Sequence, residues 1–540
     1  MMFLKTTKGS NATYLYLAEG YREDGKVKHR ILTSFGKLED LDQKQLTDIA
    51  LKLLSLCEGH NLIDANKTDE LCRKNWGVPK VIEALWEKFR LNNFFSQIIS
   101  SRSIKYDLAG AIKLMLADRL SNPCSKYKTY LNSDYYDGLG HEELHNIYKS
   151  LNELCNIKKP LERHLFNECK FYSYIELDVV FFDVTTFHFE SVNQDEIRDF
   201  GYSKACKFNE VQVVLSLFIS KNGIPLGFDT FPGNTYEGNT LSTAIRRLKD
   251  DYKINKIIVV ADKGINSGVN LQTIIEEGFE YIVGSRIKNL TRNMQQKVLN
   301  ITNYQCANEF EEAEPLFKYK IIDYEKKIKI GKTYKAIPSK LVCTWSAKRA
   351  KKDAFDRERL VNKAKKILKE GDSAEGRGAK KYLINTTPKA YELNEDKIIQ
   401  DAKWDGFYAL ETSDKDLSAE TVLNAYKQLW KIEESFRIYK SHLETRPLYH
   451  WNPERIQGHF VLSYIAFLFE RSLEIELNKL NRNPCSPIKI RDAINKMEFS
   501  ELAFGNNKHK IYAPLEALGA DILQVLNIKM PVKKINKTAA

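Results

Sequence analysis

The amino-acid sequence predicts a multidomain α/β protein. Its 540 residues exceed the roughly 250–300 residues at which a single hydrophobic core stops growing. Residues 173–290 alternate short apolar strands with amphipathic helices in the order β-β-β-α-β-α-β, which is typical of a mixed sheet covered by helices. Residues 61–172 instead have helical periodicity, as in 'VIEALWEKFRLNNFFSQIIS'. This change of period predicts separate domains.

Five regions follow one another along the chain. They are an N-terminal β-hairpin and helix (1–60), a helical domain (61–172), an α/β domain in two pieces (173–290 and 400–475), a basic insertion domain between these pieces (291–399), and a C-terminal region with a basic tail (476–540). An Asp-Gly turn at Asp24-Gly25 predicts the hairpin. The second piece of the α/β domain contains two predicted long helices, 'SAETVLNAYKQLWKIEESFRIYK' and 'ERIQGHFVLSYIAFLFERSLEIELN'.

The composition limits the classes of protein to which this chain can belong. No apolar run reaches the length of about 18 residues that a membrane-spanning helix needs, and the N-terminus lacks a signal-peptide pattern, so we expect an intracellular, cytoplasmic protein. The nine cysteines are scattered singly, which argues against a zinc site and a disulfide framework. The net charge is +12, and residues 317–370 hold 18 Lys and Arg against 6 Asp and Glu. That block indicates a nucleic-acid partner, or else a solvated helix face.

Two aspartates are predicted to meet at one edge of the sheet. Asp183 follows the apolar run 'VVFF' within a strand, and Asp262 follows 'KIIVVA' at the carboxyl end of another, where open α/β sheets bind ligands. A buried carboxylate is costly unless a partner compensates its charge. Asp183 therefore has either a structural partner, which can be a cation or a set of hydrogen-bond donors, or a metal ion. Each aspartate taken singly has a turn or cap role as its simpler reading.

A third acid lies on the first of the two long helices. Tyr426, Glu433 and Lys440 are spaced at i, i+7 and i+14, which places them on one helical face together with Leu429 and Arg437. An aromatic, an acid and two bases on one face form a plausible active-site wall, although an exposed, salt-bridged surface is the simpler alternative. Glu434 points about 100° away, so we choose Glu433 as the site residue.

Two acids on strands and one on a helix suit a pair of Mg²⁺ ions, for which Mn²⁺ can substitute. Hard divalent cations prefer oxygen ligands, and two ions roughly 3.5–4 Å apart can hold the attacking and leaving oxygens of a phosphodiester. The predicted metal ligands and catalytic residues are therefore Asp183, Asp262 and Glu433. We expect Lys440 and Arg437 to hold the phosphate, because Arg binds phosphate in a bidentate manner.

The order of elements and the three acids resemble the ribonuclease-H-like core of DDE transposases from bacterial insertion sequences. Asp262 and Glu433 are 171 positions apart, and the segment between them is similar to the long insertion of these enzymes. Tyr426, Glu433 and Lys440 match three of the four positions of the Tyr-Arg-Glu-Lys signature of one cut-and-paste subgroup. Leu429 stands where that signature has Arg, so Lys431 or Arg437 would have to supply its DNA contact.

The resemblance implies an activity and its partners. It implies nicking, hairpin formation and opening, and strand transfer of double-stranded DNA, at transposon ends and in target DNA, by a homodimer or larger assembly. It also implies that residues 61–172 bind the transposon ends, that Arg286 and Lys288 grip end DNA, and that Trp404 or Tyr408 stacks on a flipped base. An ordinary strand-end charge or a core aromatic is the simpler reading of these four residues.

Two other functions remain open from the sequence. A structure-specific nuclease would use the same core but would release only cleaved ends, whereas a transposase would also join DNA. A DNA-binding regulator with a decayed core would not need all three acids.

Overall fold

The computed structural model describes residues 2–55, 68–201, 209–306, 317–330, 333–370, 378–387, 390–446, 448–480, 485–504 and 507–531. By their internal contacts, these residues form two units, one of residues 2–73 and 500–511 and the other of residues 74–499 and 512–531. Residues 532–540, which form most of the predicted basic tail, lie outside the described residues. None of the helices in these ranges combines the length and hydrophobicity that crossing a bilayer requires.

The first unit contains the predicted hairpin. Strands β2 (Thr13–Glu23) and β3 (Lys26–Lys37) pair antiparallel, and helix α1 (Gln43–Ser55) follows them. Asp24 and Gly25 both have positive φ, +50° and +74°, as a two-residue hairpin turn requires. The hairpin prediction is confirmed. Strand β1 (Met2–Lys8) adds an edge strand that was not predicted, because its mostly exposed residues give little apolar signal.

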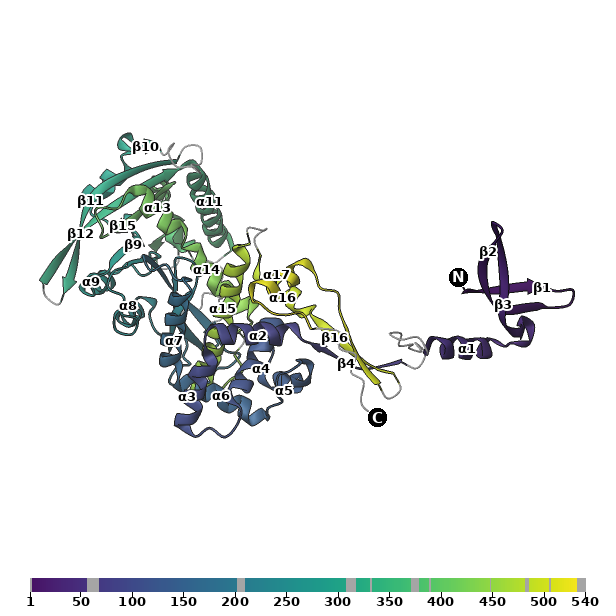
Figure 1. Cartoon of the computed structure of the whole chain (residues 1–540). Coiled ribbons are helices and arrows are strands. Elements are labelled where there is room, and N and C mark those ends of the chain that lie inside the picture. Colours follow the sequence, from purple (N-terminus) through teal and green to yellow (C-terminus); the bar gives the residue numbers. More distant parts are fainter. Residues whose placement is uncertain are drawn as a thin grey trace. The chain divides into compact units, whose positions relative to one another are not determined.

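A nine-stranded mixed sheet forms the centre of the second unit (Figure 1). Its core contains, in chain order, β5 (Val179–His188), β6 (Gln212–Ser220), β7 (Pro225–Pro232), α8 (Leu241–Asp250), β8 (Ile258–Ala261), α9 (Gly268–Glu276) and β9 (Glu280–Gly284). This is the predicted β-β-β-α-β-α-β order. Strands β5, β8 and β9 are parallel neighbours, whereas β6 and β7 pair antiparallel at the end of the sheet.

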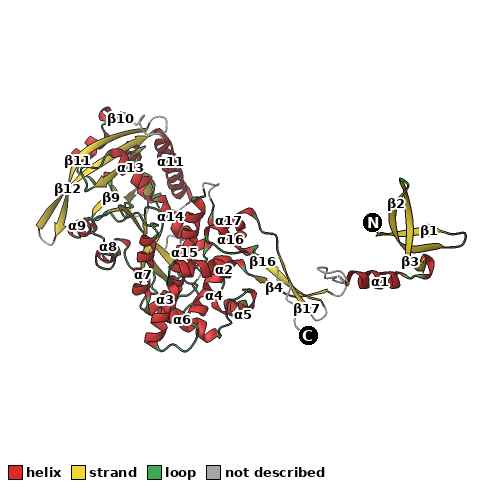
Figure 2. Ribbon diagram, in the orientation of Figure 1, coloured by secondary structure: helices red, strands yellow, loops and turns green. Residues whose placement is uncertain are grey.

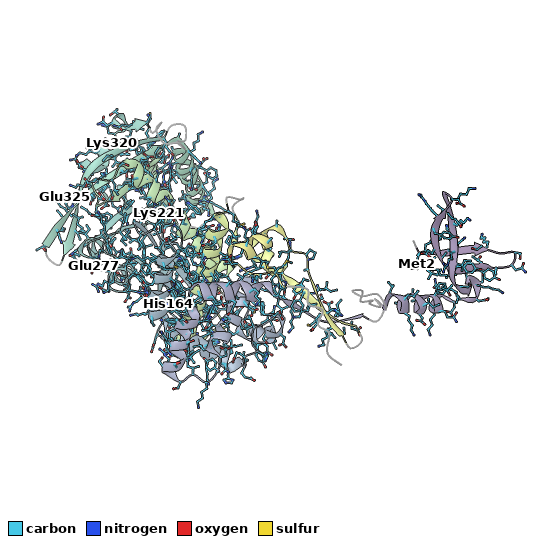
Figure 3. All side chains as sticks on the ribbon, in the orientation of Figure 1. Met2, His164, Lys221, Glu277, Lys320 and Glu325 are labelled. Carbon is cyan, nitrogen blue, oxygen red and sulfur yellow. The ribbon has the colours of Figure 1, made fainter. Side chains whose placement is uncertain are left out.

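The insertion extends this same sheet. The strand order is β10-β11-β12-β15-β9-β8-β5-β6-β7, with β10 (Gln305–Cys306), β11 (Phe317–Ile330), β12 (Thr333–Ser346) and β15 (Phe407–Thr412) on one side of the core. Lys320 and Glu325 mark the course of β11 in Figure 3. The rest of the insertion comprises α10 (Arg292–Leu299), α11 (Ala347–Glu370), β13 (Leu383–Thr387), β14 (Ala390–Leu393) and α12 (Glu395–Ala402).

The two faces of the sheet pack against different helices. Val180, Phe182 and Val184 of β5 share a hydrophobic core with residues of α8 and α9. Val179, Phe181 and Phe187 share a core with residues of α13 (Ala419–Lys427), α14 (Trp430–Arg437) and α15 (Pro453–Asn478). Because side chains alternate along a strand, the odd-numbered residues of β5 all face α13–α15.

Helix α15 is buried along most of its length, and helices α4 and α6 pack against it (these helices are labelled in Figure 2). A Cβ on Gly458 would lie 1.9 Å from the Leu151 carbonyl oxygen, so the contact with α6 requires glycine there. The remaining helices are α2 (Gly77–Lys88), α3 (Leu91–Arg102), α4 (Leu108–Ser121), α5 (Lys126–Leu131), α6 (Leu144–Asn156), α7 (Lys158–Phe171), α16 (Pro487–Asn495) and α17 (Ala517–Val525). A separate three-stranded sheet has the order β17 (Asn507–Tyr512), β16 (Glu498–Phe504), β4 (Thr68–Asn75).

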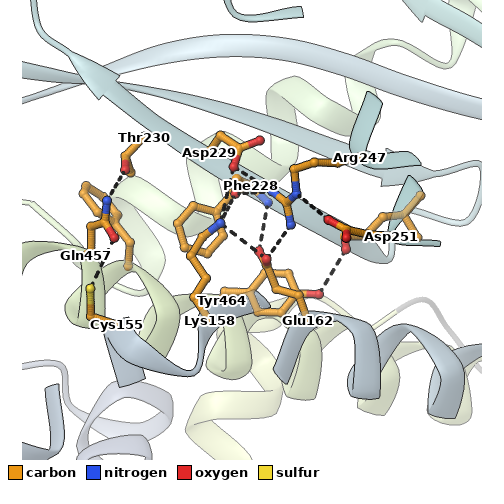
Figure 4. A network of polar contacts seen from close by, with 12 residues as sticks. Cys155, Lys158, Glu162, Phe228, Asp229, Thr230, Arg247, Asp251, Gln457 and Tyr464 are labelled. Atoms are coloured by element: carbon orange, nitrogen blue, oxygen red, sulfur yellow. Dashed lines mark hydrogen bonds and ion pairs between the residues drawn. The ribbon is translucent and has the colours of Figure 1, made fainter. Parts of the chain in front are cut away.

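A buried ion network joins α7 to the sheet and to α8 (Figure 4). Arg247 of α8 lies 2.5 Å from Glu162 of α7 and 2.7 Å from Asp229 of β7. Lys158 adds contacts of 3.3 Å to Glu162 and 3.4 Å to Asp229. Since Glu162 is fully buried, these cations compensate a carboxylate that water does not reach.

Candidate active site

Asp183 and Asp262 occupy neighbouring positions on two parallel strands. In the register of β5 and β8, Phe182 pairs with Ala261, and each aspartate is the next residue along its strand. Adjacent strands are about 4.8 Å apart, so the two aspartates stand side by side at the carboxyl end of β8. Both are half-buried. The predicted meeting of these two acids therefore agrees with the strand register.

Hydrogen bonds from the backbone hold the loop that follows Asp262. The Gly264 and Ile265 N–H groups donate to Asp262 Oδ1 at 2.7 and 3.3 Å. The exposed side chain of Arg286 donates to the Lys263 and Gly264 carbonyl oxygens, each at 3.1 Å. One carboxylate oxygen of Asp262 thus stabilises the loop that follows it, and the exposed Arg286 side chain stabilises the same loop through two backbone carbonyl groups.

Lys440 lies beside the strand that carries Asp183. Its ammonium group donates a hydrogen bond to Thr185 Oγ1 and lies 5.2 Å from the centre of the Phe187 ring. Thr185 is two residues beyond Asp183 and therefore points to the same face of the sheet. Lys440 belongs to a π-helical turn, Ile438–His442, which directly follows α14.

Tyr426 approaches the site from the side of Asp262. Its hydroxyl forms a 2.6 Å hydrogen bond with the Tyr408 hydroxyl. Burial raises the pKa of both phenols, and the charge of Asp262 adds to the rise. A Cβ on Gly284 would lie 2.8 Å from the Tyr408 hydroxyl, so the missing side chain makes room for this tyrosine pair.

Glu433 and Glu434 have different surroundings on α14. Glu434 is half-buried and forms an ion pair with Arg471 at 2.9 Å and a weaker one with Arg437 at 3.7 Å. Glu433 is exposed and has no hydrogen bond or ion pair with any described residue. Glu434 therefore has a structural partner, whereas Glu433 is available for a ligand.

The three acids are not gathered into one cluster in this conformation. Within the described ranges, no three His, Cys, Asp or Glu side chains are close enough to hold one metal ion. Helix α14 packs against β5, but the Glu433 side chain extends into solvent. The structure thus brings Asp183 and Asp262 together and leaves Glu433 on the adjoining helix.

The prediction of one uninterrupted helix at 418–440 is wrong. Hydrogen bonds of the i→i+3 type at Gln428, Leu429 and Lys431 tighten the chain between α13 and α14, and the π-turn widens it after α14. Rotation per residue is therefore not constant, and the predicted shared face is not kept. Leu429 is buried in the core, while the Arg437 side chain is 75% exposed.

A cavity of about 530 Å³ opens beside the Asp262 loop. It is lined by all four residues for which the resemblance implied a DNA contact, Arg286, Lys288, Trp404 and Tyr408. Trp404 is half-buried, and Lys288 forms a 3.3 Å ion pair with Asp401. Burial tends to raise the pKa of Asp401, but hydrogen bonding by Lys381 and the charge of Lys288 lower it to about 2.

The same cavity contains cations that the sequence did not single out. Lys263 follows Asp262 directly, and α11 contributes Arg349 and Arg357. The Arg349 guanidinium lies 4.4 Å from the centre of the Tyr408 ring, and Arg357 forms an ion pair with Asp405. The high Lys and Arg density of residues 317–370 pointed to this segment but could not select the members that reach the cavity.

The comparisons with known proteins identify the family. The family model for the transposase DDE domain matches residues 175–469, which is more than half of the chain, and the model for the N-terminal domain of IS1634 family transposases matches residues 4–60. The chain belongs to the insertion-sequence DDE transposases. The predicted family, the ribonuclease-H-like fold class and the DNA transposase function are thereby confirmed.

The two other comparisons do not extend the family assignment of this transposase. The cryo-EM structure of the piggyBac transposase synaptic complex with hairpin DNA aligns with 73% of each chain, at 8% sequence identity and a TM-score of 0.37. The search of curated proteins returned no match. The transposase is a DNA-cleaving enzyme of its family, and DNA is its partner.

Proposed function

We propose that the enzyme moves an insertion sequence by cut-and-paste, with Asp183, Asp262 and Glu433 as the ligands of two Mg²⁺ ions. The in-register placement of Asp183 and Asp262 carries this proposal. Two half-buried carboxylates side by side repel each other unless a cation lies between them, and their oxygens are the donors that Mg²⁺ or Mn²⁺ prefers. When bound, the ions would activate a water or a 3′-hydroxyl and stabilise the leaving oxygen.

We infer that Glu433 completes the ligand set by moving toward the two aspartates. Its exposed side chain has no described partner to release, and irregular turns bound α14 at both ends. Side-chain rotation, together with a small tilt of α14, would bring the carboxylate toward β5. Lys440 is already beside Thr185, where it can contact the scissile phosphate.

The Tyr-Arg-Glu-Lys subgroup fits the chain except at Leu429. That residue is buried and cannot reach DNA, and Lys431 already donates to the Lys221 carbonyl oxygen at 2.7 Å (Lys221 is labelled in Figure 3). Arg437 is the more exposed of the two substitutes. We therefore assign the DNA contact of the missing Arg to Arg437.

The cavity beside Asp262 suits a flipped base. Its volume of about 530 Å³ is within the range of small-molecule sites, and Trp404 offers a ring for stacking. Tyr408 is engaged by Tyr426 and Arg349, so Trp404 is the better candidate. Arg286 and Lys288 would hold the adjoining end DNA. A hairpin intermediate is expected to require Trp404.

Incubation of the purified enzyme with a labelled transposon end, target DNA and Mg²⁺ tests this proposal. We expect nicked, hairpin and joined products, all abolished in Asp183→Asn and Asp262→Asn. Asp178→Asn is the matched control, because Asp178 precedes β5 and pairs with Lys221 at 3.2 Å, away from the site. Cleaved ends without joining would indicate a nuclease, and DNA binding without cleavage would indicate a decayed regulator.

A further inference from the structure

A second cavity, of about 670 Å³, lies between helices α4 and α5 and residues 444–446 and 448–459, the last of which belong to the start of α15. It contains none of the residues assigned above to cleavage, and Arg119 and Lys126 belong to the region, residues 61–172, that the resemblance assigns to end DNA. Four cations line it, Arg119, Lys126, Arg446 and Arg455, and Glu444 is its one carboxylate. Such an excess of positive charge in a concave site favours an anionic ligand.

Lys126 is buried in this cavity without a compensating contact. Its side chain is 3% exposed and forms no hydrogen bond or ion pair with any described residue. Asp118 contributes some attraction, but its two oxygens accept hydrogen bonds from Tyr136 at 2.7 Å and Cys124 at 3.2 Å. Burial and the charge of Arg119 lower the pKa of Lys126 to about 7. An uncompensated ammonium group in a protein interior is unfavourable, and a bound anion would relieve it.

Two more buried groups of the cavity have unused hydrogen-bonding atoms. Arg119 donates from one nitrogen to the Leu443 and Glu444 carbonyl oxygens, at 2.7 and 3.1 Å, but its Nε has no partner among the described residues. His459 Nε2 faces the Thr445 carbonyl oxygen at 3.3 Å and therefore carries the proton. Its Nδ1 is then an acceptor, also without a described partner. The cavity thus offers donors for an anion and an acceptor for a hydroxyl or amine of the same ligand.

Exposed aromatic side chains lie at the rim. Tyr449 and Trp451 line the cavity, and they are 66% and 62% exposed. Large aromatic side chains in solvent beside a cationic site are typical stacking platforms for nucleic-acid bases. A phosphate inside and a base at the rim together describe a nucleotide.

The cavity also lies near the proposed cleavage site. Glu444 is four residues beyond Lys440, so their Cα atoms are at most about 14 Å apart. The Arg198 guanidinium is 5.3 Å from the Trp451 ring and 5.6 Å from that of Phe189, which directly follows β5. One turn of duplex DNA spans about 34 Å. A DNA strand held at Asp183 can therefore extend to this cavity within half a turn.

We propose that this cavity binds one nucleotide of the DNA strand that crosses the active site, with its phosphate on Lys126, Arg119 and Arg446 and its base against Trp451. The assignment to DNA rests on the proposed function, whereas binding of a phosphate group does not. A free nucleotide has the same chemistry and is the alternative source of the ligand.

Binding without divalent metal tests the proposal independently of cleavage. The probes are inorganic phosphate, a deoxynucleoside monophosphate and a single-stranded oligonucleotide, measured by melting temperature and by direct titration. We expect Lys126→Met to weaken all three about tenfold or more, as loss of a charged hydrogen bond predicts. Lys128→Met on the same helix is the matched control, because Lys128 is exposed and does not line the cavity.

Two further measurements, of the stability of Lys126→Met and of ligand binding by Trp451→Ala, test the proposal. Lys126→Met should raise the melting temperature of the ligand-free protein, since it removes an uncompensated buried charge, whereas a purely structural lysine would give a lower one. Trp451→Ala should weaken the monophosphate and the oligonucleotide roughly tenfold and leave inorganic phosphate unchanged. Arg446→Met is a second cavity variant, should Lys126→Met fail to fold.

Three outcomes would overturn the proposal. Absence of any phosphate-induced stabilisation in the wild type, or equal binding by Lys126→Met and Lys128→Met, would exclude an anion site. If Lys126→Met bound the monophosphate more weakly than the wild type but bound the oligonucleotide equally well, the ligand would be a free nucleotide and the assignment to DNA would be overturned. Loss of cleavage activity alone would bear on the proposed function and not on this site.

Discussion

At the scale of single residues, two adjacent glutamates on α14 have different surroundings, and we propose a metal-binding role for the exposed one. Glu434 pairs with the buried Arg471, while Glu433 is exposed without a described partner. Helical geometry separates them by about 100°, and on that ground we predicted Glu433 as the site residue, which stays a prediction. The sequence could not place the Glu433 carboxylate relative to the aspartates, because that depends on the side-chain rotamer and on the tilt of α14.

Glutamine substitutions should separate these two roles. Glu433→Gln should abolish DNA cleavage with Mg²⁺ and leave the free energy of unfolding unchanged. Glu434→Gln should retain cleavage but lower the stability by about 1.5 kcal/mol, because Arg471 keeps only its second partner, Glu474 at 2.6 Å. Cleavage assays and urea unfolding of both variants measure this. If the two variants behaved in the opposite way, Glu434 would be the site residue.

At the scale of elements, the order of strands and helices around the site followed from the sequence, and the helix breaks did not. The β5 and β8 runs are apolar, and Asp183 and Asp262 interrupt or end them, so both position and register were readable. The i→i+3 joint at Leu429 and the π-turn at Lys440 contain no Pro or Gly to signal them. Helices α13 and α14 pack against different strands of one sheet, and such packing is not local in sequence.

The ion network between α7, β7 and α8 gives a prediction at this scale. Arg247→Met should destabilise the enzyme by about 3–5 kcal/mol, because it leaves Glu162 buried with Lys158 as its remaining cation. The matched control is Arg246→Met, since the Arg246 side chain is 67% exposed and 3.9 Å from Glu277. That variant should change stability by about 0.5 kcal/mol or less. Equal effects in urea unfolding would show that the network does not hold these elements together.

At the scale of the whole molecule, the predicted basic insertion is both structural and exposed. Lys326 pairs with the buried Glu411 at 3.1 Å, and Lys340 donates to the Lys415 carbonyl oxygen at 2.8 Å. The charge count of the sequence treated these lysines like the exposed ones on α11, because burial is not visible in composition. Nor could the sequence show that β11 and β12 extend the core sheet through β15, since strand pairing over such separations leaves no local pattern.

The exposed lysines of α11 should contribute to DNA binding through phosphates. Lys363→Gln with Lys365→Gln should lower the slope of log K against log[salt] by about 0.9 for each phosphate that the protein no longer neutralises, or about 1.8 for both. Lys253→Gln with Lys256→Gln, also exposed but outside the insertion, should leave the slope unchanged. An unchanged slope for the α11 pair would place that helix away from DNA.

Iron-directed cleavage of the protein backbone tests the central claim most directly. With Fe²⁺ in place of Mg²⁺, and ascorbate and peroxide to generate radicals at the metal, the DNA-bound enzyme should be cut near Asp183, Asp262 and Glu433, and excess Mg²⁺ should suppress all three cuts. Cuts near the two aspartates but none near Glu433, or no cuts that Mg²⁺ suppresses, would contradict a shared metal centre formed by these three acids.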